Sequence, residues 1–370
     1  MLKGIHLTVM MGFGVPKPVP AGVVDALLSV QVTQGTEQKS GFQLSFDMGK
    51  KALVSRLFES GFFDPPQRVV IMVTTNGTIN VLMDGVITRH SVNASNEPGQ
   101  TRLEVLGEDI SRLLDLVDLS WLIKYPAIPA EGRVALILAK YMPLGLVPVI
   151  VPSVLLAVEN PLEHIPGQRG TDLQYLNLLA HQVGYVFYID PGPTPGRSIA
   201  YWGPEIKVGK VQDALVVNSD AGSNVESATF NFEGFSKTLH LILLHNAKTK
   251  IPIPIPVPDI NPLSPPLGRR MPVPLRAETV TGLSKFTVPQ AAMYGLAKAA
   301  RAAEVITGSG TLNVLRYGRP LKPRRLVEVR GAGTPHDGVH FVRSVTHLIK
   351  AGDYKQNFTL SRNAFHSSPT

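Results

Sequence analysis

The stretch that most constrains the fold is residues 337–362, whose pattern predicts a β-hairpin. In its second half Tyr354, Phe358 and Leu360 fall on one face, and polar residues alternate with them. This two-residue period is typical of a half-buried strand. The first half is rich in Val, Phe, Ile and Thr, and the sequence Ala-Gly-Asp at 351–353 supplies the turn.

The chain carries a second sequence of this kind. Asp-Gly-Val at 84–86 with Ser-Val at 91–92 matches Asp-Gly-Val at 337–339 with Ser-Val at 344–345, at an offset of 253 in both halves. At the same offset Gly99 falls on Gly352, and the strand containing Val105 falls on the strand containing Phe358. Chance is the alternative, because Asp-Gly turns are common. Agreement in strand phase, turn position and order favours a duplicated unit.

Strand patterns dominate both ends of the chain. Short alternating stretches separated by turns, with Asn-Gly at 76–77, fill residues 23–106, and a helical spacing of apolar residues follows at 108–121. Strand patterns resume at 225–244, followed by nine prolines within 252–274 and an alanine-rich helix predicted at 289–306. Prolines at this density exclude a helix or a central strand. We interpret them as a surface loop or spacer in preference to a recognition arm for an aromatic groove.

The middle of the chain differs from both ends. Helices are predicted at 131–142 and from Thr171 to a stop at Gly184, and strands at 185–189 and 198–202. The sequence therefore predicts an α+β, mainly β protein in which two related small tube-like β-barrels flank an α+β insert domain. The expected boundaries are 1–122 for the first barrel with its helix, 123–210 for the insert, and 211–370 for the second barrel, interrupted by the proline-rich loop 251–274.

Composition narrows the classes of protein. The chain has 370 residues, of which 44% are hydrophobic and 17% charged, and this excludes a mainly disordered protein. It has no cysteine, which excludes disulfides and thiolate chemistry. The net charge of +8 belongs to residues 251–370, which hold 16 Lys and Arg against 6 Asp and Glu. Their densest group could bind an acidic protein or nucleic acid, but a solvated edge is the favoured interpretation. The group consists of Arg316, Arg319, Lys322, Arg324, Arg325 and Arg330.

No stretch predicts a membrane span or a catalytic site. The apolar run at 144–158 is too short for a bilayer and contains Pro148 and Pro152. His336 and His340 flank a predicted turn, and His240 and His245 would point to opposite faces of a strand, so neither pair predicts a metal site. Known catalytic and nucleotide-binding motifs are missing. We therefore predict no catalytic, cofactor-binding or metal-ligating residue, no cofactor and no enzyme.

Aromatic residues gather in the predicted insert at Tyr185, Phe187, Tyr188, Tyr201 and Trp202. They could form a stacking platform for bases or sugars. Aromatic residues at strand spacing more often belong to the core and sheet surface, which is the interpretation we favour.

Several of these sequences together resemble one family. Thr-Asp-Leu-Gln-Tyr-Leu at 171–176, Gly-Tyr-Val-Phe-Tyr at 184–188, Pro-Gly-Pro at 191–193 and Tyr-Trp-Gly-Pro at 201–204 resemble the central domain of the phage late control protein D and baseplate hub family. The hairpin at 337–362 resembles that family's closing hairpin. Residues 7–32, together with 40–44, resemble its first barrel, particularly in phage-tail-like contractile injection systems.

The resemblance implies a structural role. Hubs of this family are trimers with two related barrels per subunit, which present a pseudo-six-fold ring between a hexameric tail tube and a trimeric spike. The implied partners are the chain itself as a homotrimer, the spike protein, the tail tube protein and other baseplate proteins, with nucleic acid only as passing cargo. The implied location is the baseplate of a virion or injection particle assembled in the bacterial cytoplasm. Because the chain ends eight residues after Arg362, the spike is expected to be a separate protein.

Two other functions compete with this one. A nucleic-acid-binding β-barrel protein would use the basic last third and the aromatic residues. A carbohydrate-active enzyme or lectin built from β domains would use its acidic residues.

Overall fold

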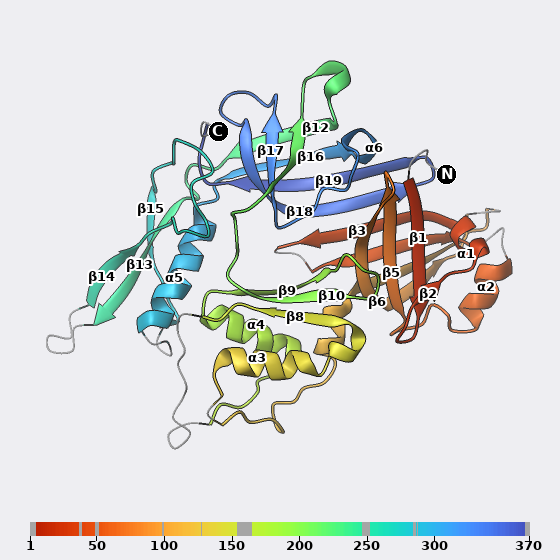
Figure 1. Cartoon of the computed structure of the whole chain (residues 1–370), viewed down its shortest axis with the longest axis horizontal. Coiled ribbons are helices and arrows are strands. Elements are labelled where there is room, and N and C mark those ends of the chain that lie inside the picture. Colours follow the sequence, from red (N-terminus) through yellow and green to blue (C-terminus); the bar gives the residue numbers. More distant parts are fainter. Residues whose placement is uncertain are drawn as a thin grey trace.

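The protein folds around one large sheet, with two small sheets and two groups of helices beside it (Figure 1). This computed structural model describes residues 5–36, 39–48, 52–97, 100–126, 128–153, 165–245, 252–283, 286 and 288–366. The large sheet has 13 strands, and each small sheet has three. The prediction of an α+β, mainly β protein is confirmed. In the part of the chain that the structure describes, the large sheet follows an open path and no closed barrel is present.

The first half of the large sheet is built by residues 5–109. Its strands run in the order β3-β4-β7-β6-β5-β1, with β2 pairing to β1. Helices α1 (Ala21–Asp25) and α2 (Ala52–Glu59) lie in the connections. The strands are β1 (Ile5–Gly12), β2 (Lys17–Pro18), β3 (Leu27–Gly35), β4 (Gly41–Asp47), β5 (Arg68–Thr75), β6 (Thr78–Asn93) and β7 (Arg102–Asp109).

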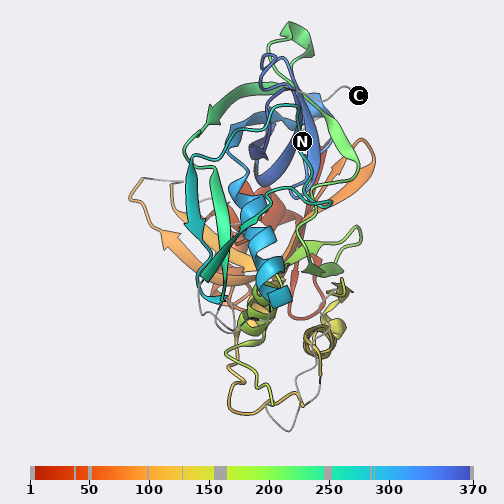
Figure 2. The same ribbon diagram turned by 90° about the vertical axis from the view of Figure 1, so that its left-hand side faces the viewer.

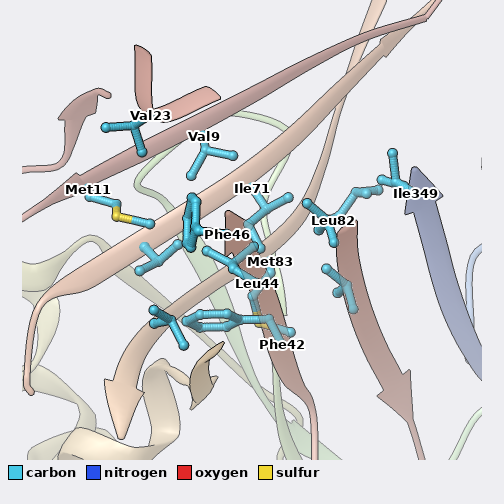
Figure 3. Close-up of a cluster of buried hydrophobic side chains, with 14 of the residues drawn as sticks. Val9, Met11, Val23, Phe42, Leu44, Phe46, Ile71, Leu82, Met83 and Ile349 are labelled. Atoms are coloured by element: carbon cyan, nitrogen blue, oxygen red, sulfur yellow. The ribbon is translucent and has the colours of Figure 1, made fainter. Parts of the chain in front are cut away.

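Asn76 and Gly77 form the turn between β5 and β6, as the sequence predicts, and both have positive φ angles, 47° and 76°. Two positive φ angles are what a two-residue hairpin turn matched to the strand twist requires. The core of this half of the sheet includes three side chains of β4, Phe42, Leu44 and Phe46, each 4% exposed or less (Figure 3). Burying one such side chain contributes about 1.5–3 kcal/mol.

The second half repeats this strand order. Residues 211–362 form the path β12-β16-β19-β18-β17-β11, with the short helices η3 (Asp220–Gly222) and α6 (Val314–Tyr317) in the connections. The direction of one strand differs: β11 runs parallel to β17, whereas β1 runs antiparallel to β5. The strands are β11 (Val211–Val216), β12 (Val225–Phe232), β16 (Ile306–Asn313), β17 (Leu326–Arg330), β18 (Gly338–Lys350) and β19 (Asp353–Arg362).

Irregularities at matching places align the two halves residue by residue. Strand β3 has a bulge at Leu28 against β4, and β12 has one at Glu226 against β16. Strand β6 has a bulge at Thr88 against β7, and β18 has one at Arg343 against β19. Bulges seldom fall at the same point of two unrelated strand pairs, because each one inserts a single extra residue. We name the two five-stranded sets β3-β4-β7-β6-β5 and β12-β16-β19-β18-β17 the first and second repeat.

A pair of backbone hydrogen bonds supports this alignment. The amide of Ile87 donates to the Gln67 carbonyl, and the amide of Val342 donates to the Arg325 carbonyl, both at 2.9 Å. Each bond lies one residue before the bulge of its strand. Residues of β6 therefore match those of β18 at an offset of 255, while β7 matches β19 at 253 and β3 matches β12 at 198.

This alignment corrects the sequence match that first suggested the duplication. The strands of Val105 and Phe358 are equivalent at an offset of 253, as expected. The Asp-Gly-Val sequences at 84–86 and 337–339 are two residues out of structural register, and Asp84 and Gly85 lie inside the continuous strand β6 rather than in a turn. A shift of two residues keeps every side chain on the same face, so the strand phase still agreed. Gly99 lies outside the described residues.

The two repeats are joined edge to edge through β18. Its first part, up to Phe341, pairs with β17 of its own repeat, whereas Ser344 to Lys350 pair with β3 of the first repeat. Ile349 of β18 packs into the core of the first repeat, beside Leu82 (Figure 3). The side chains of Thr33 and Thr346 are hydrogen-bonded across the junction at 3.2 Å. One strand thus makes the large sheet continuous.

An α+β unit lies between the repeats in sequence and packs below them in Figure 1. It consists of η1 (Ile110–Asp115), α3 (Ala130–Ala139), η2 (Met142–Leu144), β8 (Leu146–Ile150), α4 (Asp172–Gln182), β9 (Val186–Pro191) and β10 (Ser198–Gly203). Both predicted helices are confirmed, and Thr171 caps α4 with Gln174 in a capping box. The helix expected at 108–121 is wrong: only the short 3₁₀ helix η1 forms there. Its Ile110 and Leu114 pack into the core of the α+β unit rather than into the first repeat.

A second insertion separates β12 from β16, whereas only five residues of sequence separate β3 from β4. It contains β13 (Thr238–His245), β14 (Pro252–Val257), β15 (Arg276–Thr279) and α5 (Val288–Ala302). As the small residues predict, α5 packs closely on the sheet: a Cβ on Gly295 would come within 2.8 Å of Ile242. The prediction of a proline-rich loop over 251–274 is wrong for residues 252–257, which form strand β14. This strand lies at the edge of its sheet, where alternate prolines are tolerated.

No helix among the described residues is long and apolar enough to span a bilayer.

Candidate functional site

Arg324 lies where the two repeats and the α+β unit meet. Its guanidinium donates a hydrogen bond to Asp190 at 2.5 Å and another to the Gly35 carbonyl, and it lies 4.1 Å from the centre of the Tyr188 ring. A planar guanidinium with five donors can bind a carboxylate and stack on an aromatic ring at once. Burial raises the pKa of the Asp190 carboxyl, and the charge of Arg324 opposes this rise. One side chain of the second repeat thus holds β9 and the end of β3.

A buried ion pair fastens the α+β unit to the first repeat. Arg68 donates from Nε and Nη2 to the two carboxylate oxygens of Asp84, at 2.8 and 2.7 Å. The hydroxyl of Ser198 in β10 donates to Asp84 at 2.9 Å, and Arg68 also donates to the Gly196 carbonyl at 3.0 Å. The Asp84 side chain is 1% exposed. A charge this deeply buried is tolerated only when it is paired and hydrogen-bonded, so this group fixes the two parts in one geometry.

These residues were missed in the sequence. Arg68 opens an apolar run of five residues, and Asp84 follows Leu82 and Met83. A charged residue at the start of a buried apolar strand, like Arg68, or inside one, like Asp84, is a signal for an ion pair, because an isolated charge there would be strongly unfavourable. That signal gives no partner, however, and the contact of Asp84 with Ser198 joins residues 114 positions apart.

A polar cleft of about 580 Å³ opens between the β5–β6 turn and the loop before β17. Asn76 at that turn donates to the Gly318 carbonyl at 3.0 Å, so the cleft bridges the two repeats. Its cationic wall is formed by Lys210, Arg319, Lys322 and Arg325. Burial and the neighbouring Arg325 lower the pKa of Lys322. The cleft therefore gathers four cationic side chains beside one carboxylate, Asp213.

The six basic residues predicted as one group make different contacts in the structure. Arg319 is paired with Asp213, Arg330 with Glu328, and Arg324 with Asp190. Arg316 donates to the Ser223 carbonyl at 3.3 Å. Only Arg319, Lys322 and Arg325 of this group line the cleft. The structure thus brings together half of the predicted cluster and uses Arg324 as a tie between domains.

The aromatic residues of the α+β unit divide into two groups. Tyr185 and Trp202 are buried and meet edge to face at 5.0 Å, as the core interpretation predicts. Tyr188 and Tyr201 stack at 5.0 Å and line a small cavity of about 150 Å³ together with Arg324. Arg324 thus occupies one face of the Tyr188 ring, where a stacking platform would receive a base or sugar.

The histidines are placed apart from any cluster of ligands. His340 is buried beside Phe230, and burial lowers its pKa to about 3; His347 is fully buried, accepts or donates a hydrogen bond with the Tyr354 hydroxyl at 2.7 Å, and also has a pKa of about 3. His240 is buried too, and the side chain of His245 lies outside the described residues. Among the residues described, no three His, Asp or Glu gather as a metal site would need. That the chain has no catalytic, cofactor-binding or metal residue stays a prediction.

The fold of the repeated sheet and its attached α+β unit is also found in solved structures of phage tail proteins. The sequence matches no family model, and no curated protein is similar to it. Solved structures do match. The tail protein from Neisseria meningitidis is 14% identical with a TM-score of 0.62, over 97% of each chain. The prophage MuSo2 43 kDa tail protein from Shewanella oneidensis is 14% identical with a TM-score of 0.65, over 98% of this chain and 99% of that one.

Secretion machines share the fold. A type VI secretion component from E. coli, described as structurally similar to the T4 tail proteins gp27 and gp5, is 13% identical with a TM-score of 0.51 over 93% of this chain and 76% of that one. The Francisella PdpA-VgrG complex contains a chain that is 9% identical, with a TM-score of 0.58 over all of this chain and 60% of that one. At such low identities the likeness establishes the fold.

Proposed function

We propose that this protein is a structural hub in the baseplate of a contractile phage tail or a related injection particle. Three copies form a ring that presents six repeats, of which each copy supplies two. This ring joins a hexameric tail tube on one side to a trimeric spike on the other. The two repeats correspond to two tube-like barrel domains, with residues 123–210 as the α+β domain between them.

The observation that carries the proposal is the match between the two repeats. Both have the same strand order, bulges at equivalent positions, and a shared edge within one sheet. An adaptor between six-fold and three-fold partners needs two similar units in each of three chains. The tail and secretion proteins with this fold support the same role.

The proposed partners are two further copies of the chain, the spike, the tube and other baseplate proteins, in a particle assembled in the bacterial cytoplasm. The proposed role is not enzymatic. The ties made by Arg324 and Arg68 support it, because they hold domains in a fixed relation rather than shape a site for substrate.

The test is the mass of the protein in solution by size-exclusion chromatography with light scattering, alone and with its tube and spike. The expected mass is about 120 kDa for three copies of the 40.0 kDa chain, and negative-stain images should show rings. A protein that remains at 40 kDa under every condition, including with both partners present, would refute the proposal.

The two rival functions have tests of their own. A nucleic-acid-binding protein should bind single strands with an affinity that falls steeply as salt is raised, through the cleft of Lys322 and Arg325. A carbohydrate-active enzyme should cleave cell-wall glycans, and a lectin should bind them. We expect no binding and no cleavage.

A further inference from the structure

Within the chain, the β18–β3 junction joins the second repeat to the first. The strands equivalent to β18 and β3 in the opposite repeats are free to meet a neighbouring copy in the proposed ring, on which this proposal rests. In the first repeat, the strand equivalent to β18 is β6. In the second repeat, the strand equivalent to β3 is β12. Among the described residues, β12 pairs only with β16, and β6 beyond Val86 pairs only with β7. Each strand therefore keeps one side with unpaired backbone groups.

The equivalences fix which residues these are. Residues 344–350 of β18, which pair with β3, correspond to 89–95 at the offset of 255. Residues 29–35 of β3 correspond to 227–233 at the offset of 198. Of the residues 89–95, all but His90 are exposed, and Figure 2 shows their hairpin with β7 projecting from the body. An exposed strand edge of this kind is a template for pairing with another chain.

We propose that residues 89–95 of one copy pair antiparallel with residues 227–233 of a neighbouring copy, in the register of the β18–β3 junction. Ser344 lies opposite Gly35 and Lys350 opposite Ser29 within the chain. The same register places Arg89 opposite Glu233 and Ser95 opposite Ser227. Strand pairs within and between copies then alternate around the ring.

The side chains that this register brings together suit one another. On the outer face Arg89 meets Glu233. Ser91 meets Asn231, at the position where Thr346 and Thr33 are hydrogen-bonded within the chain. An opposite-charge pair and a hydrogen-bonding pair both stabilise neighbouring strands.

The inner face is mostly apolar. Val92 meets Phe230 and Ala94 meets Ala228. His90, which is hydrogen-bonded to Asp64 at 3.0 Å within its own chain, meets Phe232. Ala228 and Phe230 pack against the core of the second repeat, so this face of β12 already continues an apolar layer. Val92 is 41% exposed and Phe232 is 46% exposed, and the pairing would cover both. A shift by one residue would instead place Arg89 against Phe232 and lose the match on both faces.

The experiment uses engineered cysteines, which are unambiguous because the natural chain has none. Full-length Ser91→Cys and full-length Asn231→Cys are mixed, oxidised, and separated on a non-reducing gel. Directly opposite residues on paired strands have Cβ atoms about 4.5–5.5 Å apart, close enough for a disulfide after small adjustment. We expect a dimer band that disappears on reduction. The matched control pairs Ser91→Cys with Thr229→Cys, which lies two residues out of register and should cross-link at least about fivefold less.

A charge exchange tests the same register without oxidation. Arg89→Glu should raise the protein concentration at which half the chains assemble by about tenfold, and adding Glu233→Arg in the same chain should restore it. Wild-type trimers without the selective cross-link, or without rescue by the exchange, would overturn the pairing and leave the proposed hub intact. A wild-type chain that stays monomeric with tube and spike would overturn both.

Discussion

Replacing Arg68 by methionine should destabilise the protein more than any change to a surface ion pair. The variant removes two charge-assisted hydrogen bonds, at 2.8 and 2.7 Å, from an Asp84 side chain that is 1% exposed. The Ser198 hydroxyl then remains as a donor to that carboxylate. Leaving a buried charge without its partner costs about 3–5 kcal/mol, and two bonds to charged groups at about 1.5–3 kcal/mol each give a similar sum.

The assay is thermal unfolding followed by calorimetry or circular dichroism at neutral pH. For cooperative unfolding of 370 residues, a loss of about 4 kcal/mol lowers Tm by about 5 °C. The matched control is Arg276→Met, which breaks the ion pair with Glu278 in which both side chains are well exposed; it should lower Tm by about 1 °C or less. Combining Arg68→Met with Asp84→Leu should recover much of the loss, because an apolar pair carries no buried charge. If Arg68→Met behaves like the control, the buried pair is not a tie between the domains.

Three further predictions concern other parts of the structure. Thr171→Ala should cost about 1 kcal/mol by urea denaturation because it removes the cap of α4, whereas Thr78→Ala in the β5–β6 hairpin should change little. Arg324→Lys keeps the charge but loses the planar fork, so amide exchange in β9 should become at least about tenfold faster; unchanged exchange would show that the stacking is dispensable. Burial lowers the pKa of His347 to about 3, against about 6.5 when unfolded, so the unfolded chain binds more protons between these values and stability is lost as pH falls. His347→Gln should therefore reduce the decline in the free energy of unfolding between pH 6 and 4 by about 1.4 kcal/mol per pH unit. An identical slope in both proteins would contradict the burial of His347.

Local patterns in the sequence predicted much of the secondary structure. Asn76 and Gly77 identified the turn, and Thr171 with Gln174 identified the start of α4, because turns and caps depend on a few adjacent residues. The helix expected at 108–121 failed because its apolar residues pack into the neighbouring α+β core, and a six-residue 3₁₀ turn suffices for that. Tertiary contacts decided the outcome there, and local periodicity does not report them.

The sequence match that predicts the duplication agrees with the structure only in part. The connection between β6 and β7 is two residues longer than that between β18 and β19, which changes the offset from 255 to 253, and a sequence comparison without gaps cannot represent both. The buried contacts that join the domains could not be predicted from the sequence, for a different reason. Arg324 contacts Gly35 at a separation of 289 residues, and only the folded sheet brings these two together.

The alternate prolines of β14 restrict which strand edges of this protein can pair with another chain. Pro252, Pro254 and Pro256 all direct their nitrogen atoms to the same side of the strand, and none carries a hydrogen to donate. A strand arriving on that side would find no donor at any of these three positions, so the β14 edge of the small sheet is a poor template for a strand from another copy. Edge-to-edge pairing through β14 is thereby disfavoured. Strand pairing between copies in the proposed ring is thereby left to other surfaces, such as the free sides of β6 and β12.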